Sequence, residues 1–233
     1  MYDDWYDKLE EISRFIALLK KPFPTFHVAK SVGEAISRGE SGGEENALER
    51  FETNCILAQE IGSQKLVLHL WNGVYSDNDF SRNVKAYEPL RRIADCYGLL
   101  LTVENVVCNM GTPISRLKEL LEIFPDIAFT FDVKMSQIHG ELDNVYKEEN
   151  GDVFRHVAHM HISDYRGGIK DWSNLKTLHI GEGQIDFERF FRFVKDIGYC
   201  GDFTIEALSV DESGTMDFDK MNESVKKLRA YIA

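Results

Sequence analysis

The sequence predicts an α/β protein of the (β/α) barrel class, and two features support this prediction. From about residue 25 onward, short runs rich in β-branched and aromatic residues alternate with longer amphipathic stretches. This alternation is typical of βαβ units that build a parallel sheet. Several of the short runs also end in polar residues at similar spacing, as expected where parallel strands meet at one catalytic face.

Seven segments have the pattern of a strand. They are residues 25–29, 65–71, 99–104, 127–133, 156–163, a weak run at 177–180, and 202–207. A closed barrel of this class has eight strands, and the chain before residue 25 shows only a helical pattern at residues 6–20. We therefore expect a TIM-type (β/α) barrel that lacks or rearranges its first strand. An open strand edge is usually covered, and a homodimer is one way to cover it.

The segments between the strands have apolar residues at helical spacing, as Leu117, Leu120 and Leu121 illustrate. The predicted helices are residues 44–61, 81–97, 113–124 and 187–197, with an N-terminal helix in residues 1–24 and a closing helix at 218–231. Several end at glycine, a common helix stop. Residues 135–152 form the least regular connection.

Composition narrows the class of protein. A chain of 233 residues with 43% hydrophobic residues suits one domain over residues 1–233. A formal net charge of -12 opposes the phosphate neutralisation on which nucleic-acid binding depends. No apolar run approaches the roughly 20 residues of a membrane span, and the acidic N-terminus is unlike a signal peptide. These features predict a cytoplasmic protein that binds neither membranes nor nucleic acid.

Three predicted strands end in Thr-x-acid and a fourth ends in His-x-His. The segments are TVE at 102–104, TFD at 130–132, TIE at 204–206 and HMH at 159–161. Side chains alternate across a strand, so each Thr shares a face with its acid while Val103, Phe131 and Ile205 point toward the helices. The spacing predicts that Glu104, Asp132, His161 and Glu206 meet at the carboxyl ends of the strands.

Three carboxylates brought together would repel one another unless a cation compensated. Two Glu, one Asp and one His form an oxygen-rich ligand set that suits Mn²⁺, Mg²⁺ or Co²⁺ and can accept Zn²⁺. We therefore expect one divalent metal ion here. The alternative is that the acids make separate ion pairs at the starts of loops.

Other polar or aromatic residues follow the same strands and are candidates for substrate binding. His27 and His69 lie in or at the end of strands, Trp71 follows His69, and Lys134 follows Asp132. Lys134 could meet a carboxylate or phosphate on the substrate, or only neutralise the site. The loop that carries His179 and Glu182 contains two glycines that permit close approach to a ligand. Each of these residues could instead serve packing or a turn, and we expect His159 to pack behind His161.

The segments LLLTVEN, FTFDVK, HVAHMHISD, HIGEGQIDF and FTIEAL resemble those of the sugar phosphate isomerase/epimerase family, whose barrel is xylose isomerase-like and is similar to that of endonuclease IV. The resemblance covers roughly residues 25–210. It implies that Glu104, Asp132, His161 and Glu206 bind a divalent metal and that Glu104 and Glu206 also move protons. One departure is Met135, where many epimerases have a histidine.

The resemblance implies an isomerase or epimerase of carbohydrate metabolism that acts on a small sugar, sugar phosphate or keto-acid. A bound metal would chelate a carbonyl and a neighbouring hydroxyl and stabilise an enediolate, while carboxylates remove and return the proton. Two alternatives remain open. One is a zinc phosphodiesterase similar to endonuclease IV, which needs three metal ions and more histidines. The other is a non-catalytic sugar-binding barrel.

Overall fold

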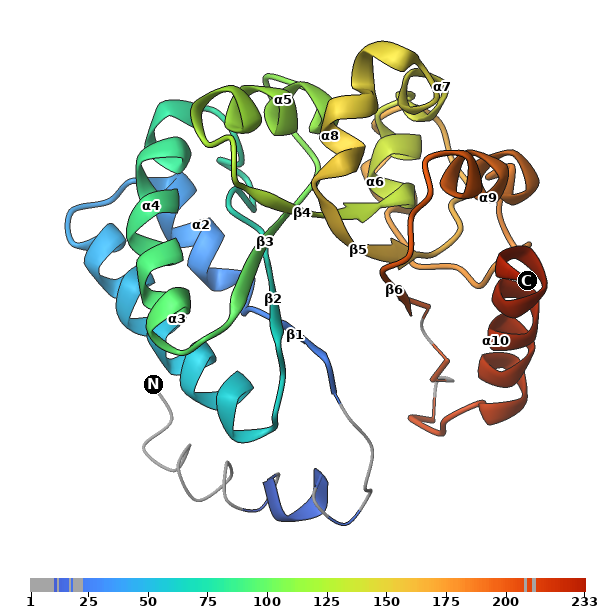
Figure 1. Ribbon diagram of the computed structural model, residues 1–233, viewed down its shortest axis with the longest axis horizontal. Coiled ribbons are helices and arrows are strands. Elements are labelled where there is room, and N and C mark those ends of the chain that lie inside the picture. Colours follow the sequence, from blue (N-terminus) through green and yellow to red (C-terminus); the bar gives the residue numbers. More distant parts are fainter. Residues whose placement is uncertain (1–10, 12, 17, 19–22, 208, 211–212) are drawn as a thin grey trace. The chain divides into compact units, whose positions relative to one another are not determined.

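The computed structural model describes residues 11, 13–16, 18, 23–207, 209–210 and 213–233 (Figure 1). The chain divides into two compact units, residues 1–103 and 104–233, and each is described by itself. The predicted helix within residues 1–24 lies largely outside the described residues. The single-domain organisation over residues 1–233 stays a prediction.

The first unit contains three parallel strands, β1 (Thr25–His27), β2 (Lys65–Leu68) and β3 (Leu100–Glu104), of which only the last residue belongs to the second unit. Leu66 on the middle strand pairs with Phe26 on one side and Leu101 on the other. The helices are α2 (Ser31–Arg38), α3 (Gly43–Glu60) and α4 (Phe80–Cys96). Their apolar sides and the strands form a core that includes the buried residues Phe51, Leu66 and Leu90.

Gly33 allows α2 to approach the end of β2. A Cβ atom at this position would overlap the backbone carbonyl of His69, so only glycine fits without a shift of the helix or the strand. The contact fixes the backbone of His69, one of the residues that the sequence singles out.

The second unit contains the parallel strands β4 (Ala128–Asp132), β5 (Val157–Ile162) and β6 (Asp202–Ile205). The register sets Asp132 beside His161, and His161 beside Thr204. The backbone N–H of Glu206 donates to the carbonyl of Ile162 at 3.0 Å, which carries the pairing one residue beyond β6. This register aligns the polar ends of the three strands.

Helices connect and cover the strands of the second unit. They are α5 (Pro113–Ile123), α6 (Val133–Ile138), α7 (Leu142–Val145), α8 (Gly151–Arg155), α9 (Phe187–Asp196) and α10 (Phe218–Ile232), with 3₁₀ turns η1 (Glu148–Asn150) and η2 (Trp172–Asn174). Residues 135–152 form several short turns, as their irregular pattern predicted.

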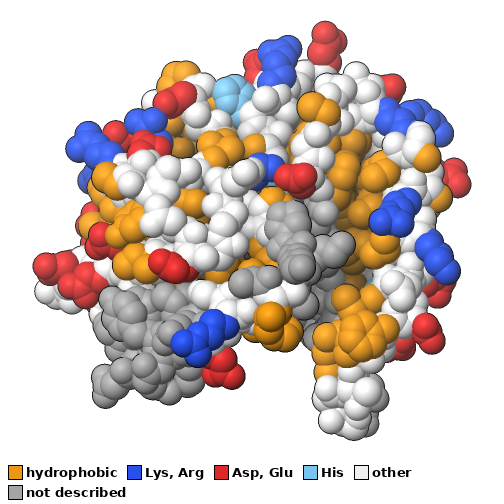
Figure 2. Space-filling model, turned by 60° about the horizontal axis from the view of Figure 1, so that its bottom comes forward, with side chains coloured by type: hydrophobic (Ala, Val, Ile, Leu, Met, Phe, Trp, Pro, Cys, Tyr) orange, Lys and Arg blue, Asp and Glu red, His pale blue; other side chains and the backbone are white. Residues whose placement is uncertain are grey.

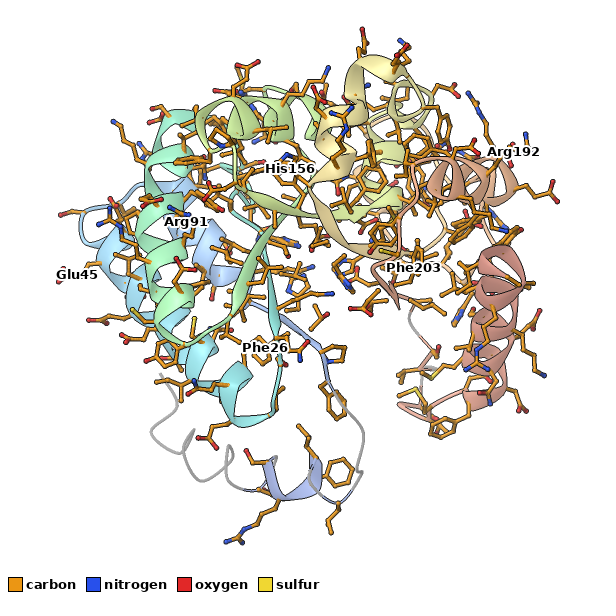
Figure 3. All side chains as sticks on the ribbon, viewed as in Figure 1. Phe26, Glu45, Arg91, His156, Arg192 and Phe203 are labelled. Carbon is orange, nitrogen blue, oxygen red and sulfur yellow. The ribbon has the colours of Figure 1, made fainter. Side chains whose placement is uncertain are left out.

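Phe131 points to the helical side, as the alternation on β4 predicted. Its ring lies 5.0 Å from that of Phe154 on α8 and 6.1 Å from that of Phe190 on α9. Phe203 on β6 packs edge-on against Tyr199 at 5.2 Å (Figure 3). The apolar face of this sheet is therefore sealed by aromatic residues, and its polar residues lie on the other face.

Each unit has three parallel strands in sequential order with helical crossovers, which confirms the predicted α/β class. The weak run at residues 177–180 is not a strand, contrary to the prediction. Its Leu178 forms one isolated antiparallel bridge with Asp164. The strand expected at residues 65–71 ends earlier, at Leu68.

Charged side chains of both signs are dispersed over the face shown in Figure 2, with hydrophobic side chains exposed between them. No helix in the described part of the chain is both long and apolar enough to cross a membrane.

Candidate metal centre

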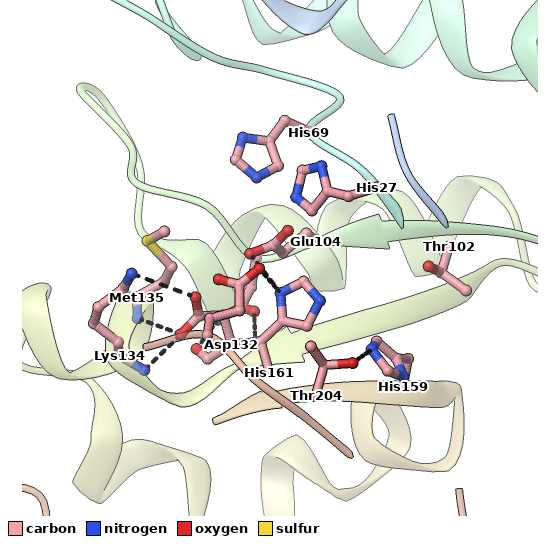
Figure 4. Close-up of polar contacts among 12 residues, drawn as sticks. His27, His69, Thr102, Glu104, Asp132, Lys134, Met135, His159, His161 and Thr204 are labelled. Carbon is pink, nitrogen blue, oxygen red and sulfur yellow. Dashed lines mark hydrogen bonds and ion pairs between the residues drawn. The ribbon is translucent and has the colours of Figure 1, made fainter. Parts of the chain in front are cut away.

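The structure brings Glu104, Asp132, His161 and Glu206 together in the second unit (Figure 4). Glu104 ends β3, Asp132 ends β4, His161 lies near the end of β5 and Glu206 directly follows β6. One potential ligand atom from each residue lies within 4.8 Å of the others. Four successive parallel βα segments therefore supply one side chain each to the same point.

The His161 ring lies between two carboxylates. Its Nδ1 atom is 3.3 Å from Glu104 Oε1 and 3.2 Å from Glu206 Oε1. Burial by itself would lower the pKa of His161, but the carboxylates of Glu104, Glu206 and Asp132 outweigh it and raise the pKa to about 9. Without a metal ion, the imidazole therefore holds a proton at neutral pH where the carboxylates converge.

Asp132 has one oxygen committed to the backbone. Its Oδ1 atom caps α6 by accepting the N–H groups of Lys134 at 2.7 Å and Met135 at 3.3 Å. The other oxygen, Oδ2, is buried and accepts no hydrogen bond from the described residues, and the ammonium of Lys134 lies 3.9 Å away. Burial raises the pKa of Asp132 to about 6, an effect that Lys134 opposes and Glu104 and Glu206 reinforce.

Asn105 holds Asp132 in place, a role that the sequence reasoning missed. Its Oδ1 accepts the N–H of Asp132 at 2.6 Å, and its Nδ2 donates to the carbonyl of Asp132 at 3.0 Å and to Ser136 Oγ at 3.2 Å. Asn105 is fully buried. Asn105 directly follows Glu104, and its side-chain amide bonds to both backbone polar groups of Asp132. It therefore aligns Glu104 with Asp132.

His159 lies behind His161, as expected. The two rings are 5.1 Å apart at nearly right angles, and Nε2 of His159 pairs with Thr204 Oγ1 at 3.0 Å. The threonine of one Thr-x-acid motif therefore orients the histidine that packs against the ring at the centre.

The donor set fits a divalent cation. It offers three carboxylates and one imidazole, and the buried Oδ2 of Asp132 points into the cluster without a hydrogen bond from the described residues. Ligands around one ion with bonds of about 2.0–2.2 Å lie at most about 4.4 Å apart, so the observed separations need only a small contraction. A mixed oxygen and nitrogen set suits Mg²⁺, Mn²⁺, Co²⁺ or Zn²⁺.

Three predicted substrate residues lie in the first unit. The rings of His27 and His69 contact each other edge-on with centroids 4.9 Å apart. His69 Nδ1 lies 3.2 Å from Asn72 Oδ1. Trp71 is fully buried and packs edge-on against Phe80 at 5.4 Å. Trp71 is thus part of the core of the first unit. Its predicted contact with substrate stays a prediction.

His179 and Glu182 lie in the loop after Leu178. The ring of His179 is buried, with Nδ1 2.6 Å from Ser224 Oγ and Nε2 3.0 Å from Ser209 Oγ. Glu182 accepts the backbone N–H of His179 at 2.9 Å and pairs with the ammonium of Lys220 at 2.8 Å. Both ring nitrogens of His179 are thus engaged in holding the loop.

Asp164 anchors the same loop, a role that the sequence reasoning also missed. Its Oδ2 accepts the N–H groups of Gly181 at 2.9 Å and Gly183 at 2.8 Å, and its Oδ1 accepts those of Tyr165 at 2.8 Å and Ile185 at 3.1 Å. The carboxylate is 1% exposed. Four N–H groups around one buried carboxylate hold the loop against the end of β5, three residues after His161.

The parallel α/β fold carries a candidate metal centre, and the family follows from comparison with known proteins. A family model described as xylose isomerase-like TIM barrel matches residues 4–231. The chain therefore belongs to the xylose isomerase-like TIM barrel family, as its motifs predicted.

Two curated relatives illustrate the similarity. An uncharacterized protein of Methanocaldococcus jannaschii is 31% identical over 185 residues, which cover 73% of this chain and 58% of that protein. L-ribulose-5-phosphate 3-epimerase UlaE of Escherichia coli is 39% identical over 54 residues, which cover 23% of this chain and 17% of that enzyme. The chain thus spans less than two thirds of the length of either relative.

Solved structures share the fold. A D-tagatose 3-epimerase-like protein matches with a TM-score of 0.74 and 21% identity, covering 97% of this chain and 82% of that one. The E. coli 3-keto-D-glucoside 4-epimerase matches with a TM-score of 0.71 and 18% identity, covering 96% of this chain and 85% of that one. The IOLI protein with a bound zinc atom matches with a TM-score of 0.75 and 14% identity, covering 100% of this chain and 86% of that one.

Proposed function

We propose that this chain is a divalent-metal-dependent isomerase or epimerase of a small sugar or sugar derivative. The observation that carries the proposal is the convergence of Glu104 and Glu206 on His161 Nδ1, within 3.3 Å, beside the buried carboxylate of Asp132. The names of similar proteins support it, because they include a D-tagatose 3-epimerase-like protein and an L-ribulose-5-phosphate 3-epimerase. A similar fold that holds zinc supports the metal.

Glu104, Asp132, His161 and Glu206 are the residues that would hold the ion. When bound, a divalent ion polarises a substrate carbonyl and so acidifies the neighbouring C–H bond. Lys134 is 4% exposed and lies 3.9 Å from Asp132 Oδ2, so its ammonium offsets part of the negative charge of the three carboxylates.

Glu104 and Glu206 are the proposed proton-transfer groups. The Glu104 side chain is 1% exposed, whereas that of Glu206 is 28% exposed. A carboxylic acid shielded from water keeps an abstracted proton, and an accessible one exchanges it with solvent. We therefore assign the solvent-exchanging role to Glu206 and the shielded role to Glu104, each acting as base or acid according to the direction of the reaction.

The substrate-binding roles predicted for six further residues stay proposals. These residues are His27, His69, Trp71, Lys134, His179 and Glu182. A cytoplasmic location and a homodimeric state also stay predictions.

The test is proton exchange at carbon. The full chain, loaded with Mn²⁺ in D₂O, is incubated with a panel of ketoses, ketose phosphates and keto-acids, and products are analysed by NMR. The proposal predicts deuterium at the carbon next to the carbonyl together with a stereoisomer or a shifted carbonyl, and neither after metal removal. Metal binding without exchange on any compound would contradict it, and cleavage of abasic DNA by a chain with three zinc ions would favour the phosphodiesterase alternative.

A further inference from the structure

Helix α10 carries an exposed apolar stripe. Five apolar residues follow one another at intervals of three and four positions, so they lie along one side of the helix. They are Phe218, Met221, Val225, Leu228 and Ile232. Leu228 is buried, but the other four are between 37% and 68% exposed. The helix packs on α9 through a different residue, Tyr231, whose ring stacks on that of Phe191 at 5.1 Å. The contact with α9 therefore leaves most of the stripe uncovered.

The stripe borders a groove between β6 and α10 (Figure 1). The groove measures about 450 Å³. Phe203 and Ile205 line it from the strand, and Val225, Leu228 and Ile232 line it from the helix. In a parallel α/β sheet, the apolar side of a covering helix normally packs against the strands beneath it. The apolar groove is therefore the place of a missing neighbour of β6.

Strand β6 ends the order of strands, so one of its edges has no neighbour in the sheet. All but one residue of β4 and of β5 are buried, whereas the residues of β6 are exposed or half-buried. The N–H of Glu206 donates to β5. Backbone groups of successive residues point to opposite edges of a strand, so those of Phe203 and Ile205 face the outer edge. No backbone hydrogen bond from outside the sheet reaches these two residues in the described part of the chain. The edge can therefore accept another strand.

We propose that a second copy of this chain occupies the groove and pairs its own β6 with this edge about a two-fold axis. A two-fold interface joins the same patch on both copies, so the patch must complement itself. The groove meets this condition, because its walls carry one acid, Asp202, and one base, Arg229. Arg229 makes no ion pair among the described residues. Asp202 of one copy can thus meet Arg229 of the other, twice in each dimer, while the apolar side chains pack together.

The net charge of the chain favours this surface over others. Two copies with a formal net charge of -12 each repel one another wherever acidic surfaces meet. The groove has an apolar lining with balanced charges, so two copies can approach there without that repulsion. This proposal concerns assembly and does not depend on the function proposed above.

The first measurement is the mass of the full chain in solution, by sedimentation equilibrium over a range of concentrations. We expect a dimer. Arg229→Asp should raise the Kd of the dimer at least about tenfold, because it sets acid against acid twice in the interface. Asp202→Arg should do the same by setting base against base. The chain with both changes restores the opposite charges and should return Kd to near the original value. Arg192→Asp, on an exposed arginine of α9 outside the groove, makes the same change in charge and should leave Kd unchanged.

The second measurement is amide hydrogen exchange at residues 203 and 205. Strand pairing engages their N–H groups, so exchange should be slow in the dimer. It should be fast in Val225→Lys, which places a charge in the apolar groove and should produce a monomer. The Val225 side chain is 37% exposed, so a lysine there can extend into water and the fold is kept.

Three results would overturn the proposal. A chain that stays monomeric up to about 1 mM would leave the groove to a different occupant. A dimer that withstands both Arg229→Asp and Val225→Lys would place the interface elsewhere. Fast exchange at both residues in the dimer would show that the copies do not pair through β6.

Discussion

Metal binding at the four-residue centre should release protons, because the metal replaces the proton on His161. A pKa of about 9 for His161 and about 6 for Asp132 means that, at pH 7, about 99% of His161 and about 10% of Asp132 are protonated. Since metal ligands must be deprotonated, each ion should release about one proton at pH 7 and more than one at pH 5.5, where Asp132 is protonated as well.

The proton on His161 also weakens the apparent affinity of the centre for a metal ion. Removing it from His161 at pH 7 costs about 100-fold in Kd, or about 2.7 kcal/mol, and this cost disappears as the pH approaches 9. Calorimetric titration of Mn²⁺ in two buffers of different ionisation enthalpy measures the number of protons released. His161→Gln should remove the release and weaken binding. His156→Gln is the control, since its ring contacts the backbone carbonyl of Ile127 and the Phe129 ring, and it should change neither. Identical heats in both buffers at pH 7 would refute the reasoning.

Further predictions concern single residues and pH. Glu104→Gln and Glu206→Gln should each lower kcat by about 10²–10⁴-fold, with the exposed Glu188→Gln as the control, and full turnover by either variant would remove it from the mechanism. Asn105→Ala leaves the buried N–H of Asp132 without its acceptor and should lower the free energy of unfolding by about 1–3 kcal/mol, measured by urea denaturation, and should weaken Mn²⁺ binding; unchanged values would refute its positioning role. Asp164→Asn should speed amide exchange at residues 181–185, and unchanged exchange there would show that the loop is held otherwise. The metal-free chain should lose stability as pH rises through about 9, because the raised pKa of His161 stabilises the folded state only while the ring is protonated; a rise in melting temperature between pH 7 and 9.5 would contradict this.

The Thr-x-acid motif could be predicted from sequence, and so could the meeting of its acids at one end of the parallel strands. Both follow from local rules. Alternation along a strand places Thr and acid on one face, and parallel strands place their ends together. The structure accordingly aligns Asp132 with His161 and His161 with Thr204. The helices at residues 44–61, 81–97, 113–124 and 187–197 are confirmed within about one residue at each end, since their apolar periodicity is strong.

Asn105, which positions Asp132, and Asp164, which holds the loop after Leu178, were missed because their contacts are distant in sequence. Asn105 contacts the backbone of Asp132, 27 residues away, and a single Asn after a strand reads as an ordinary turn residue. Asp164 accepts N–H groups 17 to 21 residues away. No local pattern encodes such partners.

The strand boundaries were wrong where side chains replace ladder hydrogen bonds. After Leu68, the carbonyl of Leu70 accepts Asn83 Nδ2 at 2.9 Å, and the N–H of Asn72 donates to Ser37 Oγ at 3.1 Å. The run at residues 177–180 has apolar residues like a strand, yet Asp164 captures the N–H of Gly181, and the chain turns there. A β-rich composition cannot reveal this competition for backbone donors.

The most direct test of the metal centre is anomalous scattering from crystals of the full chain grown with Mn²⁺. The account predicts one peak per chain, bonded at about 2.0–2.3 Å by Glu104, Asp132, His161 and Glu206. A peak elsewhere, a cluster of three ions, or no ion at these four residues would contradict it.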